Sequence, residues 1–109
     1  MSWLVRDGDV LAAVEVADSA ATRRRGLLGR DAFDGALVLR PCRSVHTARM
    51  RFPIDVAFCD TEGVVLRTVS LPPWRLSPYV HKSAFVIEAQ AGAFDRWHLR
   101  VGDRVELRA

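Results

Sequence analysis

The stretch that decides the fold is Ile54–Leu71, with the sequence IDVAFCDTEGVVLRTVSL. Its first six residues are apolar except for Asp55, a pattern that predicts a buried strand. The turn Asp60–Gly63 follows, and Gly63 lies where a tight turn needs a positive φ. A second strand then runs to Pro72, where it ends because proline donates no ladder hydrogen bond. The stretch therefore predicts an antiparallel hairpin.

Another hairpin is predicted on the N-terminal side, at 3–16, around an Asp-Gly turn at Gly8. A helix is expected next, over Ala20–Leu28. Asp18 and Ser19 are candidate N-caps, and Gly29 is the expected C-terminal stop.

Short strands are also predicted at 36–39, 84–89 and 104–108, with one helical turn at 94–99. Six or seven short strands with close turns and one short helix indicate a mainly β fold. The expected architecture is a compact antiparallel β-sandwich or barrel. At 109 residues the chain is expected to form a single domain over 1–109.

Composition narrows the function classes. No apolar run is long enough to span a bilayer, and the absence of a visible export signal favours the cytoplasm. The net charge is +3, but acidic residues are interleaved with the arginines, so nucleic-acid binding is disfavoured. The one basic cluster is 23–25, and three consecutive helical residues are expected to point in three directions. Cys42 and Cys59 are expected to be free thiols, Cys59 as a small core residue.

Several motifs in order carry a family resemblance: Arg25–Arg30 (RGLLGR), Pro53-Ile54-Asp55 leading to Gly63, Val86-Ile87-Glu88, and Gly102-Asp103. With these motifs the chain resembles the small bacterial and archaeal family known as domain of unknown function 192, from about residue 10 to 107. The resemblance implies a jelly-roll-type β-sandwich with one short helix, and it implies no reaction. Many members carry Trp-Met-Lys-Asn-Thr just before the Pro-Ile-Asp element, where this chain has His46–Met50.

Cys42, His46 and Met50 are spaced four and four, and soft ligands of this kind suit Cu(I). Val45, Thr47 and the bordering prolines favour an extended segment instead. In a strand, residues four apart stand roughly 13 Å from each other, too far to ligate one ion together. The same separation argues against a catalytic Cys42–His46 pair. His81 or His98 would be needed to complete a metal site.

Asp55 and Glu88 each interrupt an apolar strand, and an unpaired buried carboxylate is costly. One interpretation pairs each with an arginine, Arg30 or Arg25. The other places both at the mouth of the sandwich for acid–base work or ligand contact. The candidate ligand-binding residues are thus His46, Asp55, Glu88 and Arg30.

Trp74, Tyr79 and His81 lie in a proline-flanked loop, where they would form a contact patch or cover the core. The favoured function is a small cytoplasmic binding module for a small ligand or a protein partner. The alternatives are a soft-metal or redox-responsive protein using Cys42, His46 and Met50, and a hydrolase-like enzyme using Asp55 and Glu88. No cofactor is predicted, and enzymatic activity is left open.

Overall fold

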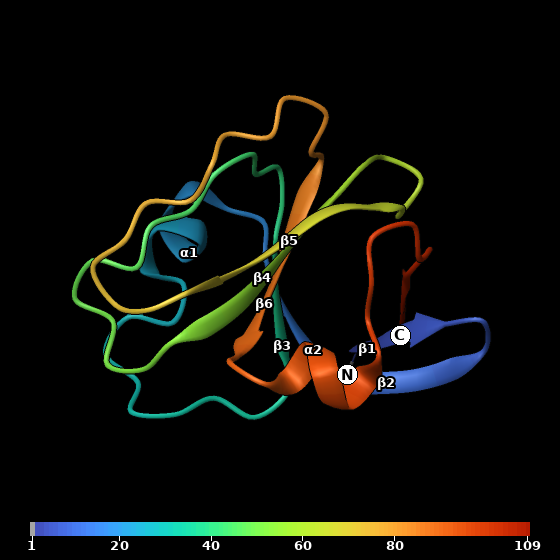
Figure 1. Cartoon of the computed structure of the whole chain (residues 1–109), viewed down its shortest axis with the longest axis horizontal. Helices are drawn as coiled ribbons and strands as arrows, with labels where there is room; N and C mark the ends of the chain where they lie inside the picture. The colour runs from blue at the N-terminus through green and yellow to red at the C-terminus, as the bar shows by residue number, and fades with distance from the viewer. Residues whose placement is uncertain (1) are drawn as a thin grey trace.

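Seven strands form one mixed sheet in the computed structural model of the chain, which describes residues 2–109. The strand order is β5-β4-β6-β3-β2-β1-β7, and two short helices accompany the sheet (Figure 1). The prediction of a mainly β fold is confirmed. The elements in chain order are β1 (Ser2–Arg6), β2 (Asp9–Ala17), α1 (Ala20–Arg25), β3 (Ala36–Leu39), β4 (Ile54–Cys59), β5 (Val65–Leu71), β6 (Phe85–Gln90), α2 (Ala93–Trp97) and β7 (Glu106–Arg108).

The predicted central hairpin is present as β4 and β5, which pair antiparallel from Ile54↔Leu71 onward. Its turn is held by Asp60, whose Oδ1 accepts hydrogen bonds from the amides of Glu62 and Val64. Gly63 has φ +84°, and a Cβ there would clash with the carbonyl oxygen of Val105. The glycine is therefore required both by the turn and by the close approach of the C-terminal segment.

One strand pairing differs from the expected antiparallel arrangement. β2 and β3 run parallel, with Val14 opposite Ala36 and Ala17 opposite Leu39. Parallel neighbours need a crossover connection. Here the chain supplies one, because α1 and the irregular segment after it carry the backbone from the end of β2 to the start of β3.

Helix α1 begins as predicted but ends early. The Ser19 side chain accepts a hydrogen bond from the Thr22 amide at 3.1 Å, which confirms Ser19 as the N-cap. The helix stops at Arg25 rather than Leu28, because Gly26 takes φ +47° and ψ −126°, a conformation outside the helical region. The predicted stop at Gly29 is wrong by one turn, and this shift places the Arg-Gly-Leu-Leu segment in a tight turn over the sheet.

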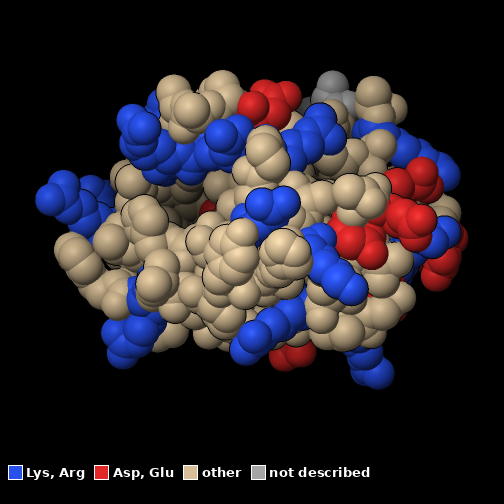
Figure 2. All heavy atoms as spheres, turned by 90° about the horizontal axis from the view of Figure 1, so that it is seen from above, with Lys and Arg blue, Asp and Glu red and all other residues tan. Residues whose placement is uncertain are grey.

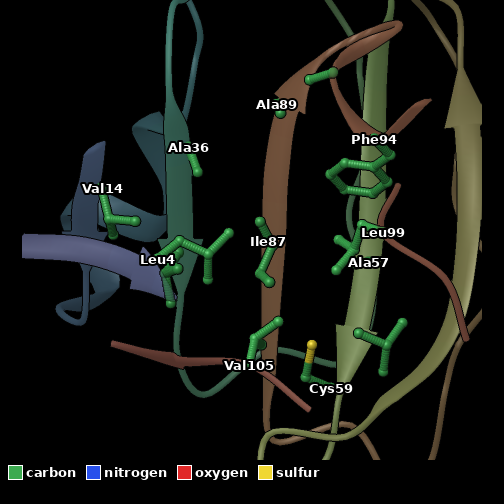
Figure 3. Packing of buried hydrophobic residues seen from close by; sticks show 13 residues of the cluster. Leu4, Val14, Ala36, Ala57, Cys59, Ile87, Ala89, Phe94, Leu99 and Val105 are labelled. Carbon is green, nitrogen blue, oxygen red and sulfur yellow. The ribbon is translucent and has the colours of Figure 1, made fainter. Parts of the chain in front are cut away.

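The core is divided between the two faces of the sheet. On one face, residues of β1, β2, β3, β4 and β6 pack with α2 and the C-terminal segment, and Figure 3 shows Leu4, Ile87, Ala57 and Phe94 within this cluster. The other face carries Leu37, Leu39, Ile54, Val56, Phe58 and Val86. Figure 1 shows α1 and two long loops over this second face. Because both faces are covered, every residue of β3 and β4 is buried.

The two edges of the sheet are linked by the C-terminal segment. Val64 forms an isolated antiparallel bridge with Arg104, and the Val65 amide donates to the Asp103 carbonyl at 2.8 Å. The sheet consequently curls, so that the start of β5 lies against the residues leading into β7. Among residues 2–109 no helix has the length and apolar character needed to cross a membrane.

Candidate functional site

A cavity of about 820 Å³ lies between α1, the sheet and the two long loops. Figure 2 shows a hollow on this part of the surface, with Lys and Arg side chains along its edge. Its volume falls within the range of small-molecule binding pockets. The lining residues come from α1 and its following turn (Arg23, Arg24, Arg25, Gly26, Leu27, Leu28), from the sheet (Leu39, Glu88) and from the loops (Pro41, Cys42, Arg43, Ser44, Val45, His46, Met50, Tyr79, Ser83, Ala84).

The loop wall of the cavity is built by side chains that bond to backbone groups of the opposite loop. Thr47 is fully buried, and its hydroxyl donates to the Pro72 carbonyl at 2.7 Å and accepts from the Arg75 amide at 2.8 Å. Ser77 Oγ accepts from the Val45 amide at 2.8 Å. These bonds tie residues 41–50 to residues 72–84, so neither loop needs strand structure to be held in place.

Glu88 is the acidic residue of the cavity. It is only 5% exposed, and its register in β6 turns it to the face that α1 covers. Its carboxyl group forms no ion pair or hydrogen bond with any other group within residues 2–109, so its oxygens open into the cavity. Desolvation by burial raises the pKa of Glu88 to about 7. The group is therefore divided between its acid and carboxylate forms near neutral pH.

Gly26 gives Glu88 access to this space. A Cβ built on Gly26 would lie 3.9 Å from Glu88 Oε1. Any longer side chain at this position would therefore crowd the carboxylate, and its φ of +47° disfavours other residues as well. The early end of α1 thus leaves open space above the buried acid.

Arginines form the rim of the cavity. Arg23 donates to the carbonyl oxygens of Asp18 and Arg40 at 3.2 Å, which holds its guanidinium beside the opening. Arg24, Arg25 and Arg43 also line the cavity and are exposed. None of the four has a carboxylate partner anywhere in the described chain. The expectation that Arg23–Arg25 point in three directions is wrong, because the helix ends directly after them and all three line the same opening.

Two of the four predicted ligand-binding residues share this cavity. His46 and Glu88 both line it, whereas Arg30 lies outside. The Arg30 guanidinium pairs with Glu15 at 2.9 Å and lies 4.9 Å over the Phe33 ring. The interpretation that Arg30 or Arg25 neutralises Asp55 or Glu88 is therefore wrong: within residues 2–109 neither carboxylate has an arginine partner.

Asp55 lies on the opposite face of the sheet from Glu88. In the β4–β6 register Asp55 is opposite Ala89 and Val56 is opposite Glu88, and alternate residues point to opposite faces. Asp55 Oδ2 accepts hydrogen bonds from the amides of Gly92 at 3.0 Å and Phe94 at 3.1 Å. It therefore holds the start of α2. The hydrolase-like alternative requires Asp55 and Glu88 to share one site, and the structure places them on opposite faces of the sheet.

Cys42, His46 and Met50 do line one cavity, against the expectation that an extended segment separates them. Residues 41–53 form no strand, because Thr47 and Met50 close a turn with Arg49 at φ +63°. The predicted extended segment over these residues is therefore wrong. No three His, Cys, Asp or Glu side chains in the described structure are grouped to hold a metal ion.

The thiols differ in setting. Burial raises the pKa of Cys42, the nearby Glu88 raises it further, and the Cys42 Sγ donates to the Ser44 carbonyl at 3.2 Å. Cys59 is fully buried in the core, and burial raises its pKa to about 12. Both cysteines are free, as predicted, and both are held as thiols rather than thiolates at neutral pH.

The proline-flanked loop presents its aromatic residues to solvent. Trp74 and Tyr79 are each 63% exposed and Leu76 is 76% exposed, so they do not cover the core. Tyr79 contributes to the cavity wall, and His81 is exposed away from it. Trp74 is held through its backbone instead, because its amide donates to the Thr47 carbonyl at 2.8 Å.

The sequence did not predict the arginine rim of the cavity or the hydrogen bonds that join the two long loops. The Arg-Arg-Arg-Gly sequence at 23–26 held a usable signal, because a glycine after a short run of helix formers ends the helix beside its basic residues. The roles of Thr47 and Ser77 left no comparable signal. Each depends on a partner about thirty residues away in the chain.

The fold and the site together define a class of protein. It is a mainly β protein with a curled mixed sheet, in which a single helix covers one sheet face and an arginine-rimmed cavity lies beneath that helix. A family model described as an uncharacterized ACR, DUF192, matches residues 3–107. The chain belongs to this family. A UPF0127 protein of Pyrococcus abyssi is 34% identical over 100 residues, which cover 85% of this chain and 84% of the relative.

Two crystal structures have the same fold. A protein of unknown function from Novosphingobium aromaticivorans superposes with a TM-score of 0.82 at 20% identity, covering 96% of this chain and 82% of that one. A protein of Sinorhizobium meliloti, named as a proposed transcription regulator, gives a TM-score of 0.79 at 23% identity, covering 96% and 90%. At these identities the likeness establishes the fold alone.

Proposed function

We propose that this chain is a single-domain cytoplasmic binding module whose cavity under α1 takes a small organic anion. The observation that supports this most directly is the set of four rim arginines that lack carboxylate partners in the described structure. Guanidinium groups bind carboxylates and phosphates through paired N–H donors. The apolar walls, formed by Leu27, Leu39 and Met50, would contact the carbon skeleton of the ligand. Two free cysteines suit a reducing compartment.

A thermal-shift panel tests the proposal. The panel contains carboxylates, sugar phosphates, amino acids and nucleotides, and at least one of them should raise the Tm of the wild-type chain saturably. The double variant Arg24→Gln/Arg25→Gln should lose most of that shift. The matched control, Arg67→Gln/Arg100→Gln, removes the same charge from two exposed arginines outside the cavity and should keep the shift. A panel without any saturable shift, or equal loss in both variants, would contradict the proposal.

A soft-metal or redox function would use the same cavity, because Cys42, His46 and Met50 all line it. Metal binding needs the thiolate, and the raised pKa of Cys42 opposes its formation. Titration with Cu(I) under reducing conditions, read by native mass spectrometry, decides between the two. If copper binds stoichiometrically to the wild-type chain and this binding is lost in Cys42→Ser, the result would favour the metal-binding function over the anion-binding function.

A protein partner would be expected at a different place. Trp74, Leu76 and Tyr79 are exposed together on the loop 72–84, and aromatic residues are common at interface hot spots. Pull-down with the wild-type chain and with Leu76→Asp separates this outcome. A saturable partner that is lost in Leu76→Asp and kept in the rim variant would move the function from the cavity to this loop.

A further inference from the structure

Two opposite charges face the same cavity from different depths. The buried carboxyl group of Glu88 lies on the sheet side, and Arg23, Arg24, Arg25 and Arg43 line the opening. No carboxylate partner is found for the arginines, and no donor for Glu88, within residues 2–109. A ligand that is purely anionic would satisfy the rim and leave the buried acid without a partner.

Glu88 points to a ligand independently of the arginines, because a carboxyl group that is only 5% exposed and has no donor is unfavourable unless a partner reaches it from the cavity. No donor of the described chain is bonded to Glu88. The two cavity donors whose bonds are defined are used elsewhere: Cys42 donates its thiol to the Ser44 carbonyl, and Arg23 donates to two backbone carbonyls. The conformation of Gly26 keeps the space above Oε1 free of side chain. The position is therefore built to leave a buried acceptor facing the cavity.

We propose that the ligand carries a protonated nitrogen as well as an anionic group, with the nitrogen on the Glu88 carboxylate and the anion on the rim arginines. This inference rests on the proposed function, because it assigns the second end of the same ligand. The ionic contact at Glu88 is made at a buried position in a cavity that Leu27 and Leu39 also line, and a charge pair at a buried position is stronger than in water. The cationic rim selects against simple amines, which have no group to offset four arginines.

Because Glu88 can take up a proton, binding of this ligand class should depend on pH. Burial raises the pKa of Glu88 to about 7, so the free protein holds the group partly as the neutral acid at neutral pH. An ammonium group requires the carboxylate, so binding at pH 7 should release about half a proton per site. Affinity should rise as the pH increases from 6 to 8. The other titratable groups at the cavity are Cys42 and His46 from the loop 41–50 and Tyr79 from the loop 72–84.

Matched probes test the inference by isothermal titration calorimetry on the full chain. 5-Aminopentanoate is compared with pentanoate and 5-hydroxypentanoate, and O-phosphoethanolamine with ethyl phosphate. At least one amine-bearing probe should bind tenfold or more tightly than its matched anion, with proton release measured in two buffers of different ionisation enthalpy. In Glu88→Gln this preference should fall to less than threefold.

The outcomes separate the two proposals. If pentanoate or ethyl phosphate binds as tightly as its amine, or if the hydroxyl probe matches the amine, the inference is overturned and the anion-binding function stands. If no probe binds although the thermal-shift panel yields a saturable anion, the inference is overturned and the anion-binding function stands; if the panel is also negative, both proposals are contradicted. Circular dichroism and the Tm of Glu88→Gln show whether the variant is folded. If it is not, the proton release and the probe ranking of the wild-type chain alone decide the result.

Discussion

At the scale of single residues, two carboxylates in neighbouring strands have opposite roles because of strand register. Asp55 and Glu88 look alike in the sequence, each set among apolar neighbours. A shift of one residue across β4 and β6 turns Asp55 toward α2 and Glu88 toward the cavity. Asp55 is satisfied by two backbone amides, whereas Glu88 has none. The first therefore supports the fold, and the second is free to meet a ligand.

Glu88→Gln should change the pH dependence of stability. Burial raises the pKa of Glu88 from 4.5 to about 7, so the folded chain holds a proton that the unfolded chain has lost between these values. The wild-type stability contributed by this group is complete below about pH 4.5 and is lost as the pH rises through 7. Relative to the wild type, the variant should gain about 3 kcal/mol between pH 4 and pH 8. Urea unfolding of both chains across this pH range measures the difference in their free energies of unfolding. A difference that does not change with pH would contradict the raised pKa of Glu88.

Asp55→Ala should destabilise the chain without affecting the cavity. The substitution leaves the amides of Gly92 and Phe94 without their acceptor, which is expected to reduce the free energy of unfolding by about 2 kcal/mol. Asp55→Asn keeps an acceptor oxygen and should lose less. Probe affinity at the cavity should be unchanged in both, because Asp55 lies on the other sheet face. Loss of binding in a folded Asp55→Asn chain would argue against this separation.

At the scale of elements, the hairpins and the two long loops depend on different kinds of information. The β4–β5 hairpin is predictable because its turn and both strands lie within eighteen consecutive residues, Ile54–Leu71, with Gly63 at the turn. The loops 41–50 and 72–84 have no such local signal. Their conformation is set by contacts such as Thr47 with Arg75, which are far apart in sequence. The cavity wall could not be predicted for the same reason, whereas the mainly β fold could.

Thr47→Val should loosen the loop wall. The variant keeps the side-chain volume but removes the hydroxyl that bonds to Pro72 and Arg75, which leaves two partly buried backbone groups without this partner. We expect a loss of about 1–3 kcal/mol in unfolding free energy. Hydrogen exchange at the Trp74 and Arg75 amides should become faster. Thr47→Ser keeps the hydroxyl and serves as the control, and equal exchange in the two variants would show that the hydroxyl does not fasten the loops.

At the scale of the whole molecule, the curl of the sheet depends on the contact between Gly63 and the segment leading to β7. The Val105 amide donates to the Gly63 carbonyl at 2.9 Å, and Val64 bridges Arg104. This contact joins the two sheet edges and encloses one half of the core. The other face is left to α1 and the loops, which is why the cavity lies there and not within the curled sheet.

Gly63→Ala should weaken this closure. The variant places a Cβ against the Val105 carbonyl and also strains a backbone at φ +84°. Gly8→Ala is the matched control, because Gly8 has φ +83° but no atom within 4 Å of its Cβ position. Both should lose stability through strain, and Gly63→Ala should lose at least about 1 kcal/mol more. Thermal unfolding measures the difference, and equal Tm values would mean that the close approach does not matter.

The central claim is that the arginine-rimmed cavity under α1 is where this protein binds its ligand. Two-dimensional NMR of the ¹⁵N-labelled chain tests it most directly, with the tightest organic anion from the thermal-shift panel as the titrant. Saturable shifts are predicted for the amides of Gly26, Ser44 and Ala84, which border the cavity, and none for Gly8 and Gly102. Shifts centred on the loop 72–78 or on α2, with the cavity amides unmoved, would contradict the claim.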